Sequence, residues 1–294
     1  MEILPTWLFF ALGFSFLATG LRATNEYFKV NGHALVFWRG LLPALCMIPM
    51  AFMNPWPTNP VFYFAVLTTI PIVTFIDSIH FEASRKFGAG VPSRLLPTGI
   101  LITFIGWLII KPEQIDAYLA NPVWGIAIIL SLGSIVFFAS RLRHCEVSRS
   151  AFIFMLPVVL SGGIVTMLNK TAMDNSGLHQ GVWFYILLQG TGVAVMAVLR
   201  DKLKKRSIKK LFSKELIKAG MVICFFTIAG TAFKGYGLAM VDNPAYFAAV
   251  GMLSPFWIIC LYKIIGRKED GIDVISGLFL VSSVIALVLF KGML

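Results

Sequence analysis

Charged residues are scarce in this sequence: Asp, Glu, Lys and Arg make up only 13% of its 294 residues. Soluble proteins carry about 25% charged residues, so this composition excludes a soluble fold for most of the chain. Cysteine is also rare, with 4 residues and no CxxC spacing. This scarcity argues against a disulfide framework and gives no indication of a metal site.

Two glycine-rich nucleotide-binding patterns, GxxxxGK(S/T) and GxGxxG, are absent from the sequence. We therefore expect no ATP-driven transport by this chain alone and no cofactor. No nucleophile or metal cluster accompanies Asp77 and His80, and His33, His144 and His179 are scattered, so we expect that the protein is not an enzyme. The alternative is an intramembrane enzyme acting on lipids, with Asp77 and His80 as acid and base.

Apolar residues are abundant instead, at 58% of the chain with a mean hydropathy of +0.83. They form ten runs, and about 20 apolar residues are enough to cross the hydrocarbon. We predict ten membrane helices, because only helices and closed barrels satisfy the backbone in lipid and the runs lack the alternation of barrel strands. The expected helices cover residues 4–28, 34–53, 61–84, 90–110, 123–140, 150–173, 181–199, 216–240, 244–264 and 271–290. The first run lacks a basic n-region and a cleavage site, so we expect a retained span rather than a signal peptide.

Several features recur in the two halves of the chain, residues 1–147 and 148–294. The matching pairs are Asn25-Glu26 with Asn169-Lys170, Trp38-Arg39-Gly40 with Leu188-Gln189-Gly190, and Ala83 and Pro97 with Ala239 and Pro255. Because each half has an odd number of spans, a repeat must be inverted across the membrane. We predict an all-α membrane protein of two inverted five-helix repeats around a central cavity, with chance similarity of apolar runs as the alternative.

As an ordered set, these features resemble the drug/metabolite transporter (DMT) superfamily in its ten-helix form with two EamA-type domains. The resemblance covers nearly the whole chain and includes the stretch Asn25 to Lys29, Arg39, both Ala-to-Pro hairpins, and the turn and acid at Gly266 to Glu269. It implies a ten-helix bundle that moves solutes through a central cavity by alternating access. The third span departs from the family pattern, because Asp77, His80 and Glu82 stand where apolar and small residues are usual.

Ionisable side chains inside the predicted spans are the candidate site, because a charge in hydrocarbon costs about 3 kcal/mol or more and usually marks a pathway. Lys234 is the principal candidate, and we expect it to contact a substrate anion or an acid on another helix. A purely structural ion pair is the alternative. Asp77 and His80 are three residues apart on one helix face, so they could share and relay a coupling proton. Glu82 is expected to form an interfacial salt bridge with Arg85 and Lys86.

The other candidate substrate-binding residues are polar or aromatic positions near the expected cavity. They are Arg39, Asn25, Glu26, Asn169, Lys170, Arg94, Tyr236 and Trp257. Arg39 could anchor a carboxylate with two parallel hydrogen bonds, or extend to lipid headgroups. The spacing of Arg22, Glu26 and Lys29 predicts one helix face, either a neutralised polar stripe or part of the cavity lining.

These buried charges favour a secondary-active transporter of a small polar metabolite, amphoteric or anionic, such as an amino acid or a nucleoside-type solute. The alternative is an exporter of cationic drugs, for which Asp77 could supply the membrane carboxylate. The expected partners are the metabolite, membrane lipid, and protons or a counter-transported solute.

The basic residues predict the orientation. Nine of the 25 Lys and Arg residues lie between Arg200 and Lys218, beside two helix ends. This is typical of a cytoplasmic loop rather than of nucleic-acid binding, which we do not expect. Grouping this loop with those near residues 32, 85–90, 141–149 and 263–268 places both termini on the non-cytoplasmic side. We expect a multi-pass protein of the bacterial inner membrane.

Overall fold

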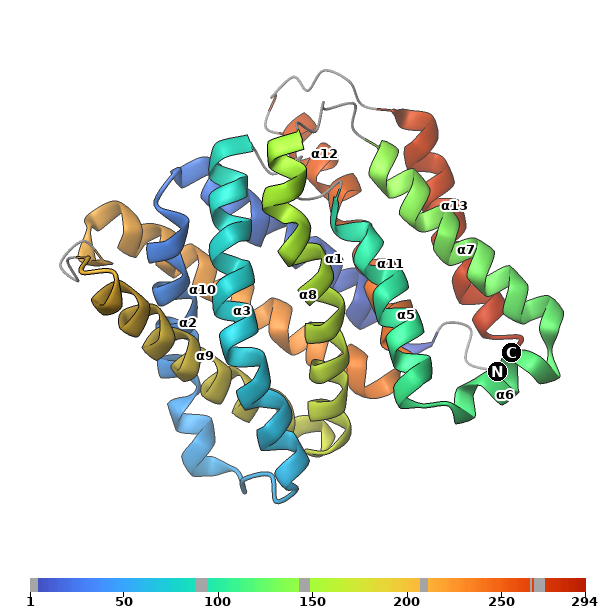
Figure 1. Ribbon diagram of the computed structural model, residues 1–294, viewed down its shortest axis with the longest axis horizontal. Coiled ribbons are helices and arrows are strands. Elements are labelled where there is room, and N and C mark those ends of the chain that lie inside the picture. The colour runs from blue at the N-terminus through green and yellow to red at the C-terminus, as the bar shows by residue number, and fades with distance from the viewer. Residues whose placement is uncertain (1–4, 88–94, 143–148, 207–210, 265, 267–272) are drawn as a thin grey trace.

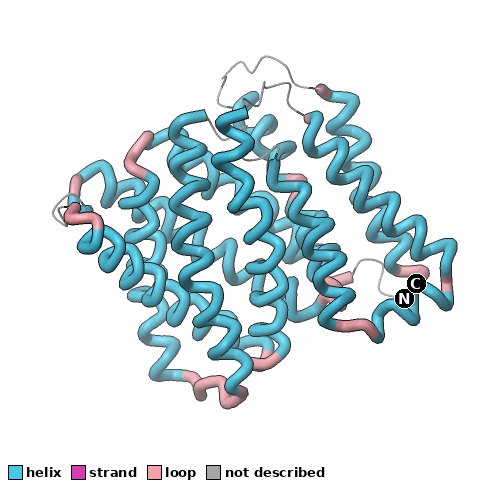
Figure 2. The backbone as a smooth tube through the Cα atoms, in the orientation of Figure 1, coloured by secondary structure: helices cyan, strands magenta, loops and turns pink. Residues whose placement is uncertain are grey.

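A computed structural model describes residues 5–87, 95–142, 149–206, 211–264, 266 and 273–294. Every regular element in these residues is a helix (Figure 2). The elements are α1 (Thr6–Phe28), α2 (Gly32–Met53), α3 (Pro60–Phe87), the 3-10 helix η1 (Leu96–Thr98), α5 (Gly99–Ile110), α6 (Glu113–Ala120), α7 (Pro122–Arg141), α8 (Arg149–Asp174), α9 (Leu178–Leu203), α10 (Lys214–Met240), α11 (Pro244–Gly251), α12 (Ser254–Ile264) and α13 (Val274–Lys291).

In this described part, nine helical segments are long and apolar enough to cross a membrane, or ten if η1, α5 and α6 count as one span. The predicted all-helical, multi-pass membrane protein is therefore confirmed. The starts of the spans expected at 90–110 and 271–290, and most of the turn from Gly266 to Glu269, lie outside the described residues.

Local sequence sets several helix ends. Asn31 precedes α2, and its side chain accepts hydrogen bonds from the backbone nitrogens of His33 and Ala34. Asn243 caps α11 in the same way, with Pro244 in the first turn, where the missing N–H is not needed. The polar turns at these two asparagines therefore separate consecutive membrane helices, as the sequence predicts.

Two segments differ from the prediction. Residues 111–121 were expected to form a loop, but Glu113–Ala120 form α6, which is bent by 107° from the preceding helix. Pro112 has a φ of −62° that suits a helix start, and acids in the first turn interact favourably with the helix dipole. The span expected at 244–264 is present over Pro244–Leu261, but its helix is interrupted between α11 and α12, and Pro255 lies in the first turn of α12.

The helices pack in pairs drawn from the two halves of the chain. The main pairs are α2 with α9, α1 with α10, α3 with α8, and α7 with α13. The last pair lies side by side at one edge of the bundle (Figure 1). At the α2–α9 crossing, a Cβ on Gly40 would lie 2.6 Å from the carbonyl oxygen of Gly190, and a Cβ on Gly190 would lie 2.7 Å from that of Gly40. Only glycine allows these two backbones to meet so closely.

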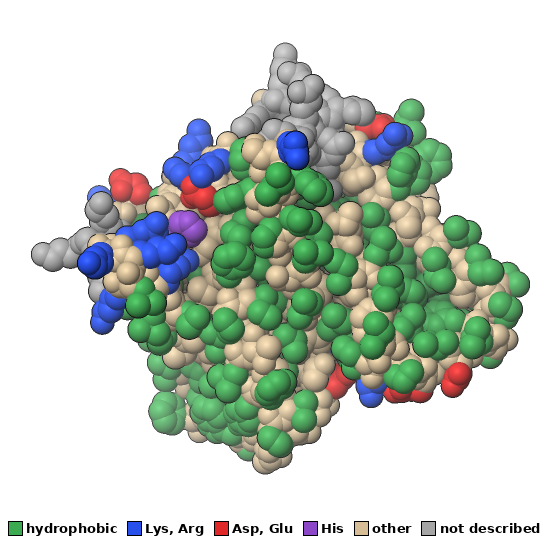
Figure 3. Space-filling model, viewed as in Figure 1, with side chains coloured by type: hydrophobic (Ala, Val, Ile, Leu, Met, Phe, Trp, Pro, Cys, Tyr) green, Lys and Arg blue, Asp and Glu red, His purple; other side chains and the backbone are tan. Residues whose placement is uncertain are grey.

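Charge is distributed unevenly over the surface. Lys and Arg gather where α9 and α3 end, at the upper left of Figure 3, and include Arg200, Lys202 and Arg85. The opposite end, near α6, carries Glu113 and Asp116, and α1 begins and α13 ends there (Figure 1). Apolar side chains cover the face between these two ends, as expected for contact with lipid.

Candidate functional site

A cavity of about 260 Å³ lies inside the bundle, lined by residues of α1, α2, α3, α8, α9 and α10 and, on the other side, of η1, α5 and α11. Its polar lining side chains are Arg22, Arg39, Asp77, His80, Thr103, Thr166, Asn169, Tyr185, Gln189, Thr227, Thr231 and Lys234. Five of the sequence-predicted candidates are thus brought to one cavity: Lys234, Arg39, Asn169, Asp77 and His80.

An ion pair connects α2 and α3 at this cavity. Arg39 Nη1 lies 2.5 Å from Asp77 Oδ2, and the two side chains are only 14% and 15% exposed. His80 also lines the cavity, and its Nε2 has no hydrogen-bond partner among the described residues. Asp77 therefore contacts Arg39 rather than His80, because the neighbouring helix offers it an opposite charge. The proton relay stays a prediction.

Lys234 of α10 takes part in a network of neutral groups instead. In the amide orientation that satisfies both ends of Asn169, Lys234 Nζ donates to the Asn169 oxygen at 2.9 Å. Tyr185 Oη lies 2.5 Å from the same amide, and Gln189 Nε2 donates to Tyr185 Oη and, at 3.1 Å, to Thr69 Oγ1. Within the described part of the chain, no carboxylate lies within salt-bridge distance of Lys234.

Arg22 of α1 supplies a third cation. It is 8% exposed, lines the cavity and donates to Ser254 Oγ at the interruption between α11 and α12. Thr19 Oγ1 donates to the Ser254 carbonyl at 3.1 Å, so α1 satisfies polar groups at this break. Glu26 and Lys29 are not in the cavity lining, and Lys29 is exposed at the helix end. The stripe predicted on α1 therefore reaches the cavity only through Arg22.

The charges in the lining do not cancel. Three cationic side chains, Arg22, Arg39 and Lys234, face one carboxylate, Asp77, which leaves a formal excess of two positive charges (3 − 1 = 2) among the described lining residues when His80 is neutral. Charges act more strongly on each other in a poorly hydrated interior than in water. The described lining therefore carries a net positive charge.

The rest of the cavity lining is mostly apolar. Leu96, Gly99 and Ile100 come from η1 and α5, Val158 and Gly162 from α8, and Phe247, Ala248 and Met252 from α11 and the break after it. The charged residues lie on α1, α2, α3 and α10. The helices η1, α5, α8 and α11 thus contribute no charged side chain to the described lining, and their polar lining residues are Thr103, Thr166 and Asn169.

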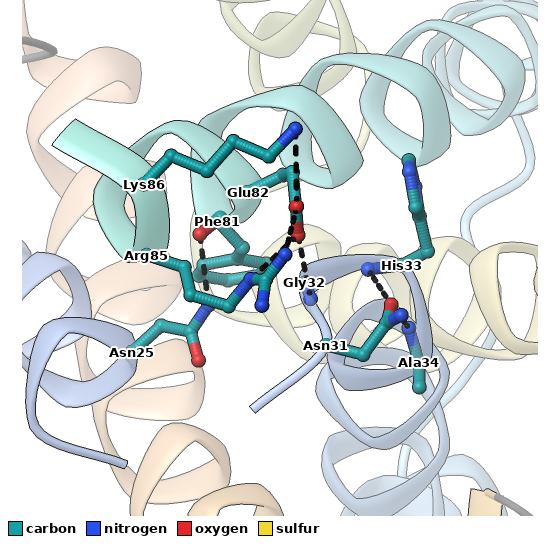
Figure 4. Close-up of polar contacts among 9 residues, drawn as sticks. All are labelled: Asn25, Asn31, Gly32, His33, Ala34, Phe81, Glu82, Arg85 and Lys86. Carbon is teal, nitrogen blue, oxygen red and sulfur yellow. Dashed lines mark hydrogen bonds and ion pairs between the residues drawn. The ribbon is translucent and has the colours of Figure 1, made fainter. Parts of the chain in front are cut away.

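Other predicted site residues lie elsewhere. Asn25 is buried, and its amide donates to the Phe81 carbonyl at 2.8 Å, as Figure 4 shows. Lys170 pairs with Asp174 at 2.5 Å, one helical turn away. Trp257 Nε1 donates to Ser15 Oγ at 2.9 Å. None of these candidates belongs to the cavity lining that the structure describes.

Three further residues predicted from the sequence as substrate-binding are not found in the described cavity lining. The ring of Tyr236 lies 5.6 Å from that of Phe10, outside the lining, and Glu26 is also outside it. Arg94 lies outside the described residues. The predicted salt bridge of Glu82 is confirmed: its carboxylate contacts Arg85, and Lys86 Nζ at 3.5 Å (Figure 4).

Tyr185 and Gln189 were missed by the sequence analysis. Gln189 stands at the position that matches Arg39 between the two halves, so the repeat itself was a signal for it. Tyr185 lies one helical turn earlier on the same face of α9 and had no signal of its own.

The end of the bundle near α6 is held together by contacts that we call the latch, formed by Trp107, Gln114, Tyr118, Asp242 and Tyr246. Trp107 Nε1 and Gln114 Nε2 donate to the Asp242 carbonyl at 3.0 and 3.1 Å. The hydroxyls of Tyr118 and Tyr246 contact each other. The latch joins α5 and α6 to the α10–α11 turn.

Comparison with known proteins assigns no family: no protein-family model matches this chain, and no curated protein matches it. The function is therefore argued from the cavity and the helix packing.

Proposed function

We propose that this protein is a secondary-active transporter, not an enzyme, that moves a small anionic or amphoteric metabolite through the central cavity by alternating access. The excess of positive charge in the lining carries this proposal. Arg39 already has Asp77 as its counterion, whereas Lys234 and Arg22 contact neutral partners. At an effective dielectric constant of 20, an anion about 4 Å from one such cation gains about 4 kcal/mol.

The same charges count against export of cationic drugs. Such a substrate needs a free carboxylate, and the carboxylate in the described lining is Asp77, which is bound by Arg39. A cation entering the cavity would also meet Lys234 and Arg22. We therefore favour an anion or a zwitterion whose carboxylate lies near Lys234.

The helix packing supports two inverted repeats, residues 1–147 and 148–294. Four helices of the first half have counterparts by order in the second: α1 with α8, α2 with α9, α3 with α10, and α7 with α13. If each helix is replaced by its counterpart, the contact of α1 with α10 becomes that of α8 with α3, and the contact of α2 with α10 becomes that of α9 with α3. All four contacts are present in the structure. The pairs α2–α9 and α7–α13 map onto themselves. This pattern fits the resemblance to the DMT superfamily.

The surface charge supports the proposed orientation. Basic side chains gather at the end opposite the two termini, and the positive-inside rule assigns that end to the cytoplasm. The latch then lies on the non-cytoplasmic side, where it closes one end of the pathway. We propose a location in the bacterial inner membrane.

A thermal-shift screen of the purified protein tests the proposal. Amino acids, nucleosides, organic carboxylates and cationic dyes are added to the parent, to Lys234→Ala and to Lys170→Ala. The last is a matched control, a buried lysine outside the cavity lining. Saturation at 100 times Kd stabilises a protein by about 2.7 kcal/mol. We expect an anion or a zwitterion to stabilise the parent and the control but not Lys234→Ala.

Proteoliposome uptake of the stabilising solute completes the test. Recovery of the solute unchanged inside the vesicles supports transport, whereas a modified product supports the enzyme alternative. Stabilisation by cationic dyes alone would overturn the proposed substrate class.

A further inference from the structure

The uneven distribution of charge in the cavity lining carries an inference about the shape of the solute, which rests on the proposed function. We infer that the solute is an organic anion with an apolar body: its anionic head binds on the side of Lys234 and Arg39, and its body lies against the wall of α5, α8 and α11. Gly162 of α8 sets the size of that body.

The apolar wall is the first observation. Leu96, Ile100, Val158, Phe247 and Met252 line it. The hydroxyls of Thr103 and Thr166 also lie on this side, but they donate to the carbonyls of Gly99 and Gly162 within their own helices. A fully hydrophilic solute would find few groups on this side to replace its hydration. An apolar body gains affinity there, by about fourfold for each methylene group removed from water.

The space at Gly162 is the second observation. A Cβ on Gly162 would meet no atom within 4 Å, although the residue lines the cavity. The neighbouring wall glycines are different: a Cβ on Gly163 would lie 3.0 Å from Ile102, and one on Gly99 would lie 3.2 Å from the Val159 carbonyl. Those two glycines permit helix packing, whereas Gly162 leaves room for something that is not protein.

A side chain at position 162 would therefore occupy the place of the apolar body. Leucine favours helix more than glycine does, so Gly162→Leu keeps α8 intact. Gly133→Leu is the matched control, because a Cβ there also meets nothing within 4 Å and Gly133 lies in α7, outside the cavity lining.

Isothermal titration of the purified full chain in detergent tests the inference. The probes are acetate, phenylacetate and 1-naphthylacetate, which share one head, together with neutral phenylacetamide and phenyl phosphate. We use binding because the protonated acids cross lipid unaided. For the parent we expect phenylacetate to bind at least tenfold more tightly than acetate and than phenylacetamide.

The variants separate head from body. Gly162→Leu is expected to lower the affinity for phenylacetate at least tenfold and the affinity for the larger 1-naphthylacetate still more. The affinity for acetate should change by less than twofold. Gly133→Leu should match the parent with every probe. Lys234→Ala should weaken the binding of every anionic probe. If phenylacetate loses more affinity than phenyl phosphate, the natural head is a carboxylate; if phenyl phosphate loses more, it is a phosphate. Either result supports the proposal.

The two proposals fail in different ways. If anions bind through Lys234 but affinity does not rise with the apolar body, or if Gly162→Leu behaves like Gly133→Leu, the inference about the body is overturned and the proposed function stands. If no anionic probe or metabolite binds the parent, the proposed function itself fails.

Discussion

The two halves of the chain contribute different chemistry to one cavity. From residues 1–147 come Arg22, the ion pair of Arg39 with Asp77, and His80; from residues 148–294 comes Lys234 in a network of amides and hydroxyls. The contrast is sharpest on helices that correspond by order, since α3 presents Asp77 and α10 presents Lys234. Similar helix packing can therefore hold unlike charges. We infer that α2 and α3 of the first half compensate each other's charges, whereas Arg22 and Lys234 contact neutral groups and remain available to the solute.

Breaking the ion pair should have the largest effect. Asp77→Asn leaves Arg39 buried without its counterion, and removing one partner of a buried pair typically costs about 3–5 kcal/mol. We expect this loss in the free energy of unfolding, measured by chemical denaturation in detergent. The double variant Arg39→Met/Asp77→Leu should recover most of it. A single variant as stable as the parent would contradict the assignment of Asp77 as a structural counterion.

Enlarging Gly40 should have the next largest effect, because it lies where the halves touch. A Cβ there would lie 2.6 Å from the Gly190 carbonyl oxygen, and backbone cannot move aside cheaply. Overpacking of this kind costs about 1–3 kcal/mol, so Gly40→Ala should lower the thermal midpoint. Gly133→Ala, where a Cβ would meet nothing within 4 Å, is the control and should leave the midpoint unchanged or raise it slightly, because alanine favours helix more than glycine does.

Loosening the latch should have a smaller effect. Trp107→Phe keeps the ring but removes the donor to the Asp242 carbonyl, and a single hydrogen bond contributes about 1 kcal/mol. We expect a decrease of that size in the free energy of unfolding. Trp257→Phe removes the hydrogen bond to Ser15 and serves as the equivalent change outside the latch. Equal rates of solute entry from both sides in the parent and in Trp107→Phe would argue against a gating role for the latch.

Removing Lys234 should change stability least. Lys234→Met loses one bond to Asn169 but also relieves the burial of a charge without a carboxylate partner, so the two effects oppose each other. We expect the free energy of unfolding to stay within about 1 kcal/mol of the parent or to rise. If Lys234→Met lowers the free energy of unfolding as much as Asp77→Asn does, the buried charges of both halves have a structural role. That result would argue against Lys234 as a solute contact.

The sequence predicted the membrane helices well, because a run of about 20 apolar residues has few alternatives in lipid. It missed α6, since residues 111–121 are too polar and short to be recognised as part of a span. The span expected at 244–264 is present, although its helix is interrupted where Ser254 and Pro255 begin α12. Such breaks depend on tertiary contacts, here with Thr19 and Arg22.

The site was predicted less completely than the fold. Arg39, Asp77, His80, Asn169 and Lys234 all reach the cavity, because burying them elsewhere in the bilayer is costly. Asn25 and Asn169 were expected to behave alike, but Asn25 bonds to a neighbouring backbone and only Asn169 reaches the cavity. Sequence spacing gives the face of a helix but not which neighbour covers that face.

The contact between Gly40 and Gly190 has a mechanical consequence. Where two main chains touch, there are no interlocked side chains to disengage, so α2 and α9 can tilt against each other with little repacking at that point. The crossing can thus serve as a fulcrum, with the largest displacements at the far ends of the helices. A rocking motion about it would widen one mouth of the bundle while narrowing the other.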